Sequence, residues 1–302
     1  MSQLERRKFI QASLALSALP LAGFAGSRLL PIDTAANSRF KLSLNAYSFN
    51  TPLRSGKITL GDVLEFCAVQ NFSAADLTAY YFPGYPQVPS DEFLYQLKRK
   101  AHHLGIAISG TGVRNDFAEP DKSIRSKDVL LVKSWIEAAA KLGAPVIRIF
   151  SGRAVSDKGS RDAVAIWMID DIRTCVEYGK KYGVIVALQN HNDFIKTADE
   201  TIDLIKKIND EWFGLVLDTG SFVTNEPYGE IEKVISYAVN WQIKEKITYN
   251  GKSQNTDLVK LFRMIKASAY RGYLPIETLS PGDPYVIIPP FLKQVRDAME
   301  KA

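Results

Sequence analysis

Short runs of apolar, β-branched and aromatic residues recur along the chain at intervals of about 25 to 40 residues. Runs such as VIVAL and GLVL are almost continuously apolar, which is typical of strands buried on both faces of a parallel sheet. Eight runs can be counted, and they begin at Phe40, Phe72, Ile106, Pro145, Val184, Phe213, Ala238 and Gly272. We therefore predict eight strands.

The segments between these runs have the pattern of amphipathic helices. Apolar residues recur at i, i+3, i+4 and i+7 in residues 60–67, 130–142 and 201–208. Candidate capping residues are Thr59 and Asp199 at helix starts, and Gly105, Gly143 and Gly183 at helix ends. Strand and helix thus alternate eight times.

This alternation predicts parallel strands that are joined by helical crossovers. Eight such units in about 250 residues match a closed (β/α)₈ barrel, the TIM barrel of the α/β class. The competing architecture, an open doubly wound sheet, usually has a glycine-rich turn after its first strand, and LSLNAYSFNTP has none. No linker divides the chain, so we expect residues 26–302 to form a single domain.

The first 25 residues have the features of an export signal. Arg6 and Arg7 precede an apolar stretch that ends in small residues, and the paired arginines resemble the twin-arginine type of signal. The stretch is short and contains Pro20, so we expect no stable membrane anchor. We predict a periplasmic location; an uncleaved apolar helix is the alternative.

The composition excludes several classes of protein. Hydrophobic residues make up 46% of the chain and charged residues 24%, which is ordinary for a globular protein. The net charge of +5 is partly carried by the N-terminal arginines, so it does not indicate a nucleic-acid partner. Cys67 and Cys175 lie in apolar helical contexts and are expected to be buried free thiols. A homo-oligomer is possible.

Polar side chains interrupt the apolar runs near their carboxyl ends. In a (β/α)₈ barrel these ends meet at one mouth, where the active site is built. The alternation of a strand places Gln242, Lys244 and Lys246 on one face of the seventh run. We expect a pocket at this mouth lined by Asp76, Arg148, Gln189, His191, Asp218, Gln242, Lys244 and Glu277.

Two of these residues are carboxylates within apolar strands. Asp218 in GLVLDTG and Glu277 in LPIETL would be costly to bury alone, so each needs a cation, a metal or a hydrogen-bond donor. Two carboxylates at one mouth suit a hard divalent ion such as Mn²⁺ or Mg²⁺. The structural alternative is a salt-bridge network with Arg148 and Lys244.

Histidines and aromatic residues add less specific signals. His191 lies at a strand end, where it is either a functional residue or a satisfied hydrogen-bonding group, whereas His102 and His103 are expected on a helix surface. Tyr81 belongs to the aromatic loop AYYFPGYP, which could stack on a sugar ring or pack against the barrel rim.

The strings VALQNHNDF, GLVLDTGSF, NWQIKEK and YRGYLPIETL resemble the sugar phosphate isomerase/epimerase family, a group of xylose isomerase-like TIM barrels. In isomerases of that group, a Glu, an Asp, a His and a Glu on the last four strands hold one divalent metal, and the two glutamates exchange protons with the sugar. The resemblance implies that the corresponding metal positions here are Gln189, Asp218, Gln242 and Glu277.

Two of these four positions depart from the family pattern. Gln189 replaces a glutamate and Gln242 replaces a histidine, so the site loses one negative charge and should hold Mn²⁺ or Mg²⁺ only weakly. An amide takes up no proton at neutral pH, so a symmetric two-glutamate mechanism is excluded. The chain is therefore expected to be a divergent member of the family.

The remaining residues predict one base and one acid. Glu277 could remove a proton next to a sugar carbonyl, while Lys244 or His191 could donate a proton or stabilise the oxyanion. Asp76, Arg148, Asn190 and Tyr81 are the candidate substrate-binding residues. A sugar isomerase or epimerase is expected; the alternatives are a lyase or hydrolase of 3-keto-glycosides and a non-catalytic carbohydrate-binding barrel. The group that the chain resembles also contains endonuclease-type AP enzymes. That branch is excluded, because its trinuclear zinc site needs more than the 3 histidines present.

Overall fold

In a computed structural model the described residues are 40–153, 160–191 and 193–302. The predicted export signal lies outside them, as do the arginine pair and Pro20. Among the described helices, none is long and apolar enough to cross a membrane.

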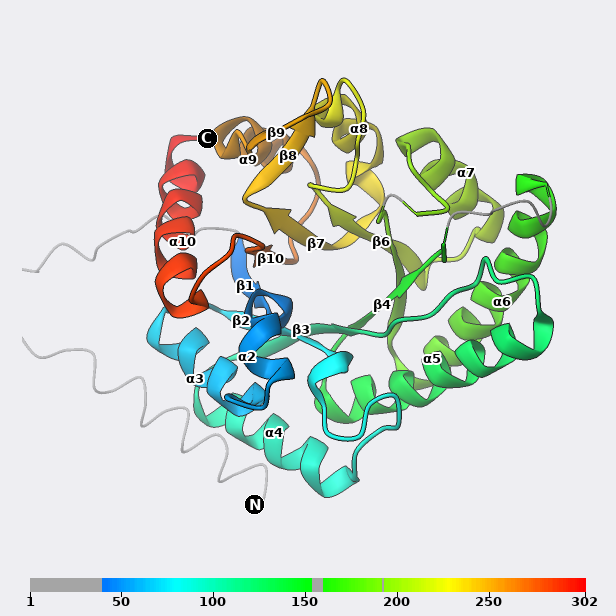
Figure 1. Cartoon of the computed structure of the whole chain (residues 1–302), viewed down its shortest axis with the longest axis horizontal. Coiled ribbons are helices and arrows are strands. Elements are labelled where there is room, and N and C mark those ends of the chain that lie inside the picture. The colour runs from blue at the N-terminus through cyan, green and yellow to red at the C-terminus, as the bar shows by residue number, and fades with distance from the viewer. Residues whose placement is uncertain (1–39, 154–159, 192) are drawn as a thin grey trace, which may run out of the picture. The chain divides into compact units, whose positions relative to one another are not determined.

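Eight parallel strands close into a barrel, and the helices surround it, as the view along the barrel shows (Figure 1). The closed order is β1-β10-β7-β6-β5-β4-β3-β2. The barrel strands are β1 (Lys41–Asn45), β2 (Ala74–Thr78), β3 (Ala107–Gly112), β4 (Val146–Phe150), β5 (Ile185–Gln189), β6 (Phe213–Asp218), β7 (Ala238–Lys244) and β10 (Tyr273–Glu277). The predicted (β/α)₈ barrel is confirmed.

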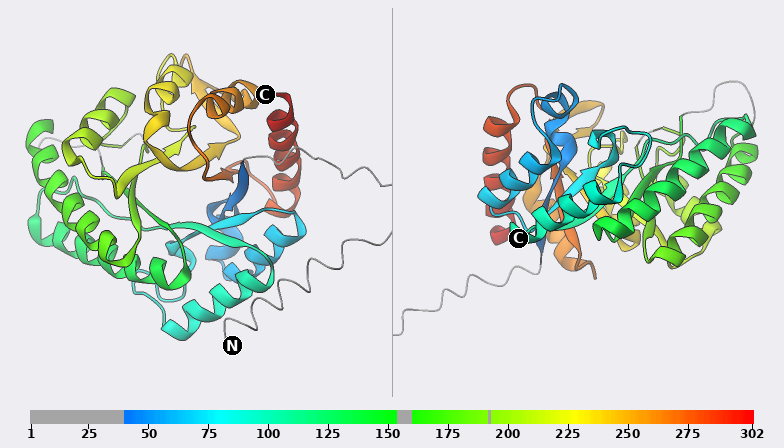
Figure 2. Two further views of the ribbon diagram at one scale, coloured as in Figure 1. Left: turned by 180° about the vertical axis from the view of Figure 1, so that it is seen from behind. Right: turned by 90° about the horizontal axis from the view of Figure 1, so that it is seen from below.

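Helices follow the strands around the outside of the ring, and the two further views show them as an outer layer (Figure 2). They are α2 (Asn50–Arg54), α3 (Leu60–Val69), α4 (Asp91–His103), α5 (Lys122–Leu142), α6 (Arg161–Tyr182), α7 (Ala198–Ile208), α8 (Pro227–Val234), α9 (Leu258–Ala267) and α10 (Pro284–Lys301). Short 3₁₀ turns are η1 (Ala46–Phe49), η2 (Ala79–Tyr81) and η3 (Ile235–Tyr237). The main apolar core lies between this layer and the strands and includes buried Trp135, Phe262 and Leu64.

Most of the predicted helix ends and side-chain environments are confirmed. Thr59 caps α3 in a capping box, and Gly143 and Gly183 end α5 and α6 in the left-handed conformation. Gly105, also left-handed, directly follows the α4 cap residue Leu104. His102 and His103 are exposed on α4, and Cys67 and Cys175 are buried free thiols.

Two predictions about local structure were wrong. Asp199 does not cap α7; Thr197 does, because its hydroxyl accepts from the Glu200 N–H while the Glu200 carboxylate accepts from the Thr197 N–H. Lys246 does not continue the seventh barrel strand. The chain leaves the barrel after Lys244 and forms an antiparallel hairpin of β8 (Lys246–Tyr249) and β9 (Lys252–Asn255), which the sequence pattern did not reveal.

Candidate active site at the carboxyl ends of the strands

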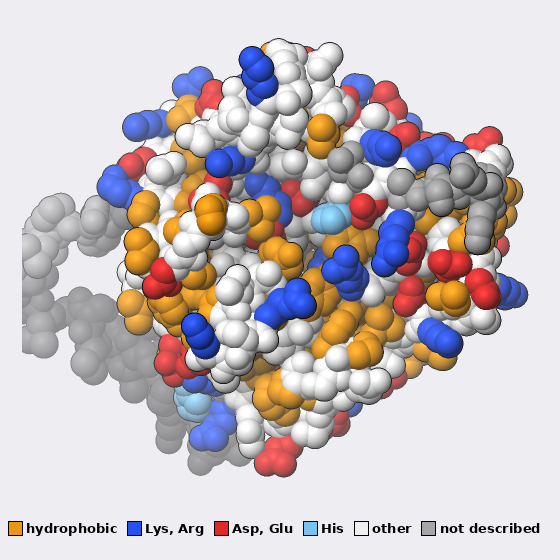
Figure 3. Space-filling view, in the orientation of Figure 1, with side chains coloured by type: hydrophobic (Ala, Val, Ile, Leu, Met, Phe, Trp, Pro, Cys, Tyr) orange, Lys and Arg blue, Asp and Glu red, His pale blue; other side chains and the backbone are white. Residues whose placement is uncertain are grey.

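A cavity of about 580 Å³ opens at the carboxyl ends of the barrel strands. In the space-filling view, charged side chains of both signs gather around a hollow in this face (Figure 3). The lining includes six of the eight residues that were expected there, namely Arg148, Gln189, His191, Gln242, Lys244 and Glu277. The remaining side chains are Asn45, Tyr47, Thr78, Tyr80, Arg114, Asn115, Asp116, Asp128, Phe150, Arg153, Asp193 and Leu279, together with Gly152.

Lys244 joins the two strand carboxylates into one cluster. Its ammonium contacts Glu277 Oε1 directly and lies 3.5 Å from Asp218 Oδ2. The register explains this arrangement, because β7 lies between β6 and β10 and pairs Asp218 with Gln242 and Glu277 with Lys244. All three ionisable side chains are buried, yet the cluster borders open space.

The Asp218 carboxylate is held by three further groups. Gln189 Nε2 donates to Asp218 Oδ2 at 2.7 Å and also to Gln242 Oε1 at 2.8 Å. The Gly220 N–H donates to Asp218 Oδ1 at 3.0 Å. The Asn190 side chain forms two hydrogen bonds of 2.9 Å with the Asp218 backbone: its Nδ2 donates to the C=O, and its Oδ1 accepts from the N–H. This network fixes the position of Asp218.

The pKa values of Glu277 and Lys244 are both raised in this cluster. Burial raises the pKa of Glu277, and the opposing effect of Lys244 does not cancel the rise. Burial alone would lower the pKa of Lys244, but the Asp218 and Glu277 carboxylates more than offset it, so the net shift is upward. Both directions agree with a buried group of two carboxylates and one ammonium, whose net charge is negative. Lys244 is therefore a cation at neutral pH.

The residues at the four family metal positions do not fit a divalent cation. Lys244 places a positive charge between the two carboxylates, where the ion would need to be. Gln189 turns its amide N–H₂ group, which cannot bind a cation, toward Asp218 and Gln242. In the part of the chain that the structure describes, no group of three or more His, Cys, Asp or Glu side chains could hold a metal.

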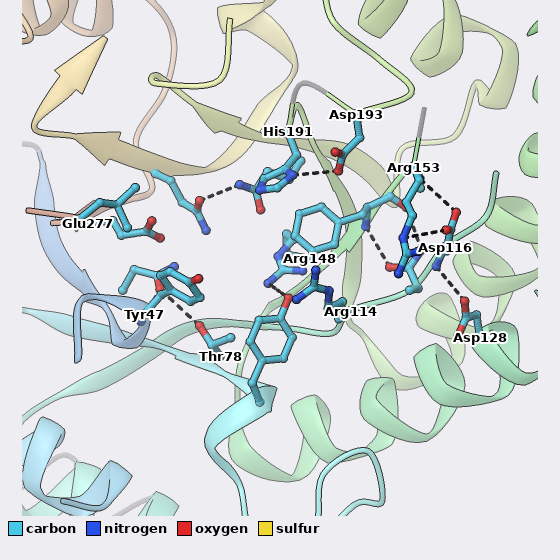
Figure 4. Close-up of a pocket in the computed structure, with 18 of the residues that line it drawn as sticks. Tyr47, Thr78, Arg114, Asp116, Asp128, Arg148, Arg153, His191, Asp193 and Glu277 are labelled. Carbon is cyan, nitrogen blue, oxygen red and sulfur yellow. Dashed lines mark hydrogen bonds and ion pairs between the residues drawn. The ribbon is translucent and has the colours of Figure 1, made fainter. Parts of the chain in front are cut away.

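One wall of the cavity combines Arg148 with aromatic rings. The Arg148 guanidinium donates to Tyr80 Oη at 2.8 Å and to the Val113 carbonyl, and it lies 4.0 Å from the centre of the Phe150 ring. Tyr47 lies at the end of the cavity near Glu277, as the close-up shows (Figure 4). Flat apolar rings beside a cation and amides suit a sugar, which has apolar faces and polar edges.

His191 lies at the rim and is oriented by a carboxylate. Its Nδ1 is 2.8 Å from Asp193 Oδ2, and its ring centre is 4.7 Å from that of Phe150. An Nδ1–H bonded to Asp193 leaves Nε2 able to exchange a proton. The side chain is 47% exposed, so this dyad belongs to the solvent side of the cavity.

Three of the candidate substrate-binding residues do not line the main cavity. Asp76 lies deeper in the barrel, where it accepts a hydrogen bond of 3.0 Å from Asn240. Asn190 is buried against the Asp218 backbone. Tyr81 lies beside the lining residue Tyr47, with ring centres 6.4 Å apart, and donates to Asn50 Oδ1 at 2.9 Å. Asp218, the other expected lining residue, borders a neighbouring cavity instead.

Sequence reasoning missed the distal end of the cavity. Figure 4 shows Asp116, Asp128 and Arg153 at the end opposite Glu277. These residues come from α5 and from the segments after β3 and β4 rather than from strand ends, so no strand pattern identifies them. Asp193 could have been noticed, because it follows His191 by two residues in NHND.

The neighbouring cavity, of about 370 Å³, shares His191, Lys244, Glu277 and Leu279 with the first. Its other walls come from the β8–β9 hairpin and from the segments after β6 and β10. They carry the polar residues Ser221, Thr248, Ser253 and Ser280 as well as apolar Ile247 and Pro281. The lysine–carboxylate cluster therefore lies where two cavities meet.

The fold and the position of the cavity place this protein among the TIM barrels. A family model described as a xylose isomerase-like TIM barrel matches residues 65–300, so the chain belongs to that family. This agrees with the resemblance noted in the strand-end sequences.

Solved structures show the same fold at low sequence identity. D-psicose 3-epimerase from Clostridium cellulolyticum H10, solved with D-tagatose, is 18% identical with a TM-score of 0.72, over 86% of this chain and 99% of that one. The 3-keto-D-glucoside 4-epimerase from E. coli is 14% identical with a TM-score of 0.67, over 85% and 99%. A probable 3-DHS dehydratase from Bacillus anthracis is 14% identical with a TM-score of 0.68, over 85% and 99%.

Proposed function

We propose that this protein is a sugar isomerase or epimerase that removes a proton from a carbon next to a carbonyl group. The observation that carries the proposal is the pairing of Glu277 with the Lys244 ammonium at the edge of an aromatic-walled cavity. Family membership and the epimerases among the structural neighbours support the same reaction class.

Glu277 is the proposed base. Burial raises its pKa, which makes the carboxylate a stronger base. When it takes the proton, the electron pair of the C–H bond moves into the carbonyl group and leaves an enolate oxygen. The Lys244 ammonium beside Glu277 stabilises that negative charge.

The proton must then return to carbon. Glu277 can deliver it to the former carbonyl carbon while the proton of the adjacent hydroxyl passes to the enolate oxygen, which gives an isomer. Alternatively, His191 can supply a proton to the original carbon from the rim side, which gives an epimer. The hydrogen bond between His191 and Asp193 orients the imidazole ring for the second route. Asp218, held by Gln189 and Asn190, keeps Lys244 in place.

A glycoside is the second candidate substrate, and the pair of adjoining cavities favours it. An oxidised sugar ring in the larger cavity would place its neighbouring group in the smaller one, with Glu277 between them. The same base could then drive β-elimination from a 3-keto-glycoside. A barrel that binds a carbohydrate without turnover would also use this cavity.

The test is hydrogen exchange at carbon. The purified protein is incubated in D₂O with a panel of ketohexoses and 3-keto-glucosides, and NMR follows both deuterium incorporation and product formation. We expect exchange by the wild type and a loss of about 10²- to 10⁴-fold in Glu277→Gln. Glu232→Gln, which changes an exposed glutamate on α8, is the matched control and should retain full activity.

The outcomes separate the candidates. Isomer or epimer formation supports the first proposal, and loss of the aglycone supports elimination. Sugar binding without exchange in either form would overturn catalysis and indicate a binding protein. Full hydrogen exchange by Glu277→Gln would show that Glu277 is not the base.

A further inference from the structure

We propose that Lys244 is a built-in replacement for a divalent cation, so that this site works without a metal and repels one. The catalytic part of this inference rests on the proposed function, whereas the exclusion of metal does not. It departs from the metal site that the family resemblance implies at Gln189, Asp218, Gln242 and Glu277.

The ammonium occupies the point where the two carboxylates converge. Lys244 Nζ contacts Glu277 and Asp218 together, and its side chain is only 11% exposed. A Mg²⁺ ion at this point would need ligand oxygens at about 2.0–2.1 Å from its own centre, which leaves no room for the ammonium. Lysine and metal are therefore mutually exclusive.

Gln189 reinforces the exclusion. Its N–H₂ group satisfies two acceptors, Asp218 Oδ2 and Gln242 Oε1, so two of the oxygens that could bind a metal are already hydrogen-bonded. Turning the amide over would set its own oxygen against those two acceptors. The network thus fixes Gln189 with hydrogens, not an oxygen, toward the cluster.

The backbone is shaped to accommodate the lysine. Gly220 follows Asp218 by two residues, and a Cβ atom there would lie 2.8 Å from Lys244 Cγ. The Lys244 N–H donates to Thr219 Oγ1 at 3.0 Å, and the Lys244 carbonyl accepts from Thr256 Oγ1 at 2.8 Å. These contacts hold Lys244 at the end of β7 with its side chain directed past Gly220 to the carboxylates.

The net charge of the lysine–carboxylate cluster also disfavours a divalent ion. One ammonium against two carboxylates leaves the cluster with a single negative charge, and a divalent ion added beside the ammonium would make it positive.

The experiment uses Mn²⁺ alone as the probe and needs no substrate. Calorimetry and thermal unfolding with Mn²⁺ or EDTA are compared for the full chain, for Lys244→Met and for Lys244→Met/Gln189→Glu/Gln242→His. We expect no Mn²⁺ binding and no change in Tm for the wild type. Each variant should bind Mn²⁺ at least about tenfold more tightly, because the repelling charge is gone, and Mn²⁺ should raise its Tm.

Two controls guard the interpretation. Lys206→Met removes an exposed lysine on α7, which lines neither of the two cavities, and should behave as the wild type does. Lys244→Arg keeps the positive charge and should also bind no Mn²⁺. If Lys244→Met folds only with Mn²⁺ present, that rescue supports the inference.

The wild-type result is decisive by itself. Micromolar binding of Mn²⁺ to the wild type that is lost in Asp218→Asn would overturn the inference, even if the protein proves to be a sugar epimerase. Equal Mn²⁺ affinity in folded Lys244→Met and the wild type would overturn it as well. A failure to turn over any sugar would leave the metal result unaffected.

Discussion

The charged residues inside this barrel serve two different purposes, which their surroundings distinguish. Glu277 and Lys244 are buried but border the cavity, whereas Asp76 is enclosed and bonded to Asn240. Burial raises the pKa of Asp76 to about 6, against the lowering effects of Arg148 and Asn240. Asp76 is therefore a group whose titration affects stability.

The sign of this effect follows from the direction of the shift. A carboxyl whose pKa is higher in the folded state than in the unfolded state stabilises the fold while it is protonated. The free energy of unfolding should therefore fall as pH rises from about 4 to about 6, by about 3 kcal/mol at most. Asp76→Asn should remove this decline and make the protein relatively more stable at pH 7.

Urea unfolding of the wild type and Asp76→Asn between pH 4 and pH 7 measures the difference. The gap should widen up to about pH 6 and then stay constant. Asp203→Asn, which changes a carboxylate on α7 that is 59% exposed, is the control and should track the wild type. A constant gap at every pH would contradict the prediction.

The convergence of Asp218 and Glu277 was predictable because parallel strands bring their carboxyl ends to one mouth. The sequence offered two partners for them, a metal or a salt-bridge network with Arg148 and Lys244. In the described part of the chain Lys244 contacts both carboxylates, while Arg148 makes no ion pair. Which partner contacts the carboxylates depends on how side chains from three neighbouring strands are directed. The hydrophobic periodicity of the sequence carries no information on this.

At the scale of elements, β3 makes room for its charged neighbours. Its sequence AISGTG places glycines beside Asp76 on β2 and Arg148 on β4. A Cβ atom on Gly110 would lie 2.7 Å from Asp76 Oδ2 and 2.9 Å from Asn240 Nδ2. The small residues of β3 are therefore required by the polar interior of the barrel.

The same substitution at two glycines should thus have opposite effects. Gly110→Ala should destabilise the protein by about 1–3 kcal/mol, because the methyl group forces two hydrogen-bonded side chains apart. Gly229→Ala on α8 meets only Glu226 Cβ at 3.8 Å and should stabilise by about 0.5 kcal/mol, because alanine favours helix. Urea unfolding checks both signs, and a neutral Gly110→Ala would show that the interior adjusts freely.

The element that the sequence failed to predict is the β8–β9 hairpin. The period of two carried the seventh strand on to Lys246, since Gln242, Lys244 and Lys246 are all polar at alternate positions of NWQIKEK. The chain instead turns out of the barrel after Lys244, and the hairpin walls the smaller cavity. An inserted hairpin of this kind is not part of the strand–helix repeat, so the hydrophobic periodicity of the repeat does not reveal it.

At the scale of the whole molecule, the strand–helix repeat that predicts the fold also explains why the barrel closes. Each apolar strand needs a neighbour on both edges, and eight units satisfy that need in a ring. The fold follows from this regular pattern, whereas the distal end of the cavity comes from loops that differ from unit to unit. The chemistry is therefore less predictable than the scaffold.

The two cysteines can test whether the barrel unfolds as one unit, as the predicted single domain requires. Cys67 in α3 and Cys175 in α6 lie in helices that are well separated in the outer layer (Figure 1). Both side chains are fully buried. Burial raises the pKa of both thiols, so neither should react with a thiol reagent until its surroundings open. If opening is global, Cys67→Ala and Cys175→Ala should each leave one thiol that is labelled at the same slow rate, after correction for any change in stability. A difference of about tenfold or more between the two would show that the two halves of the ring open separately, and the barrel would then consist of two cooperative units.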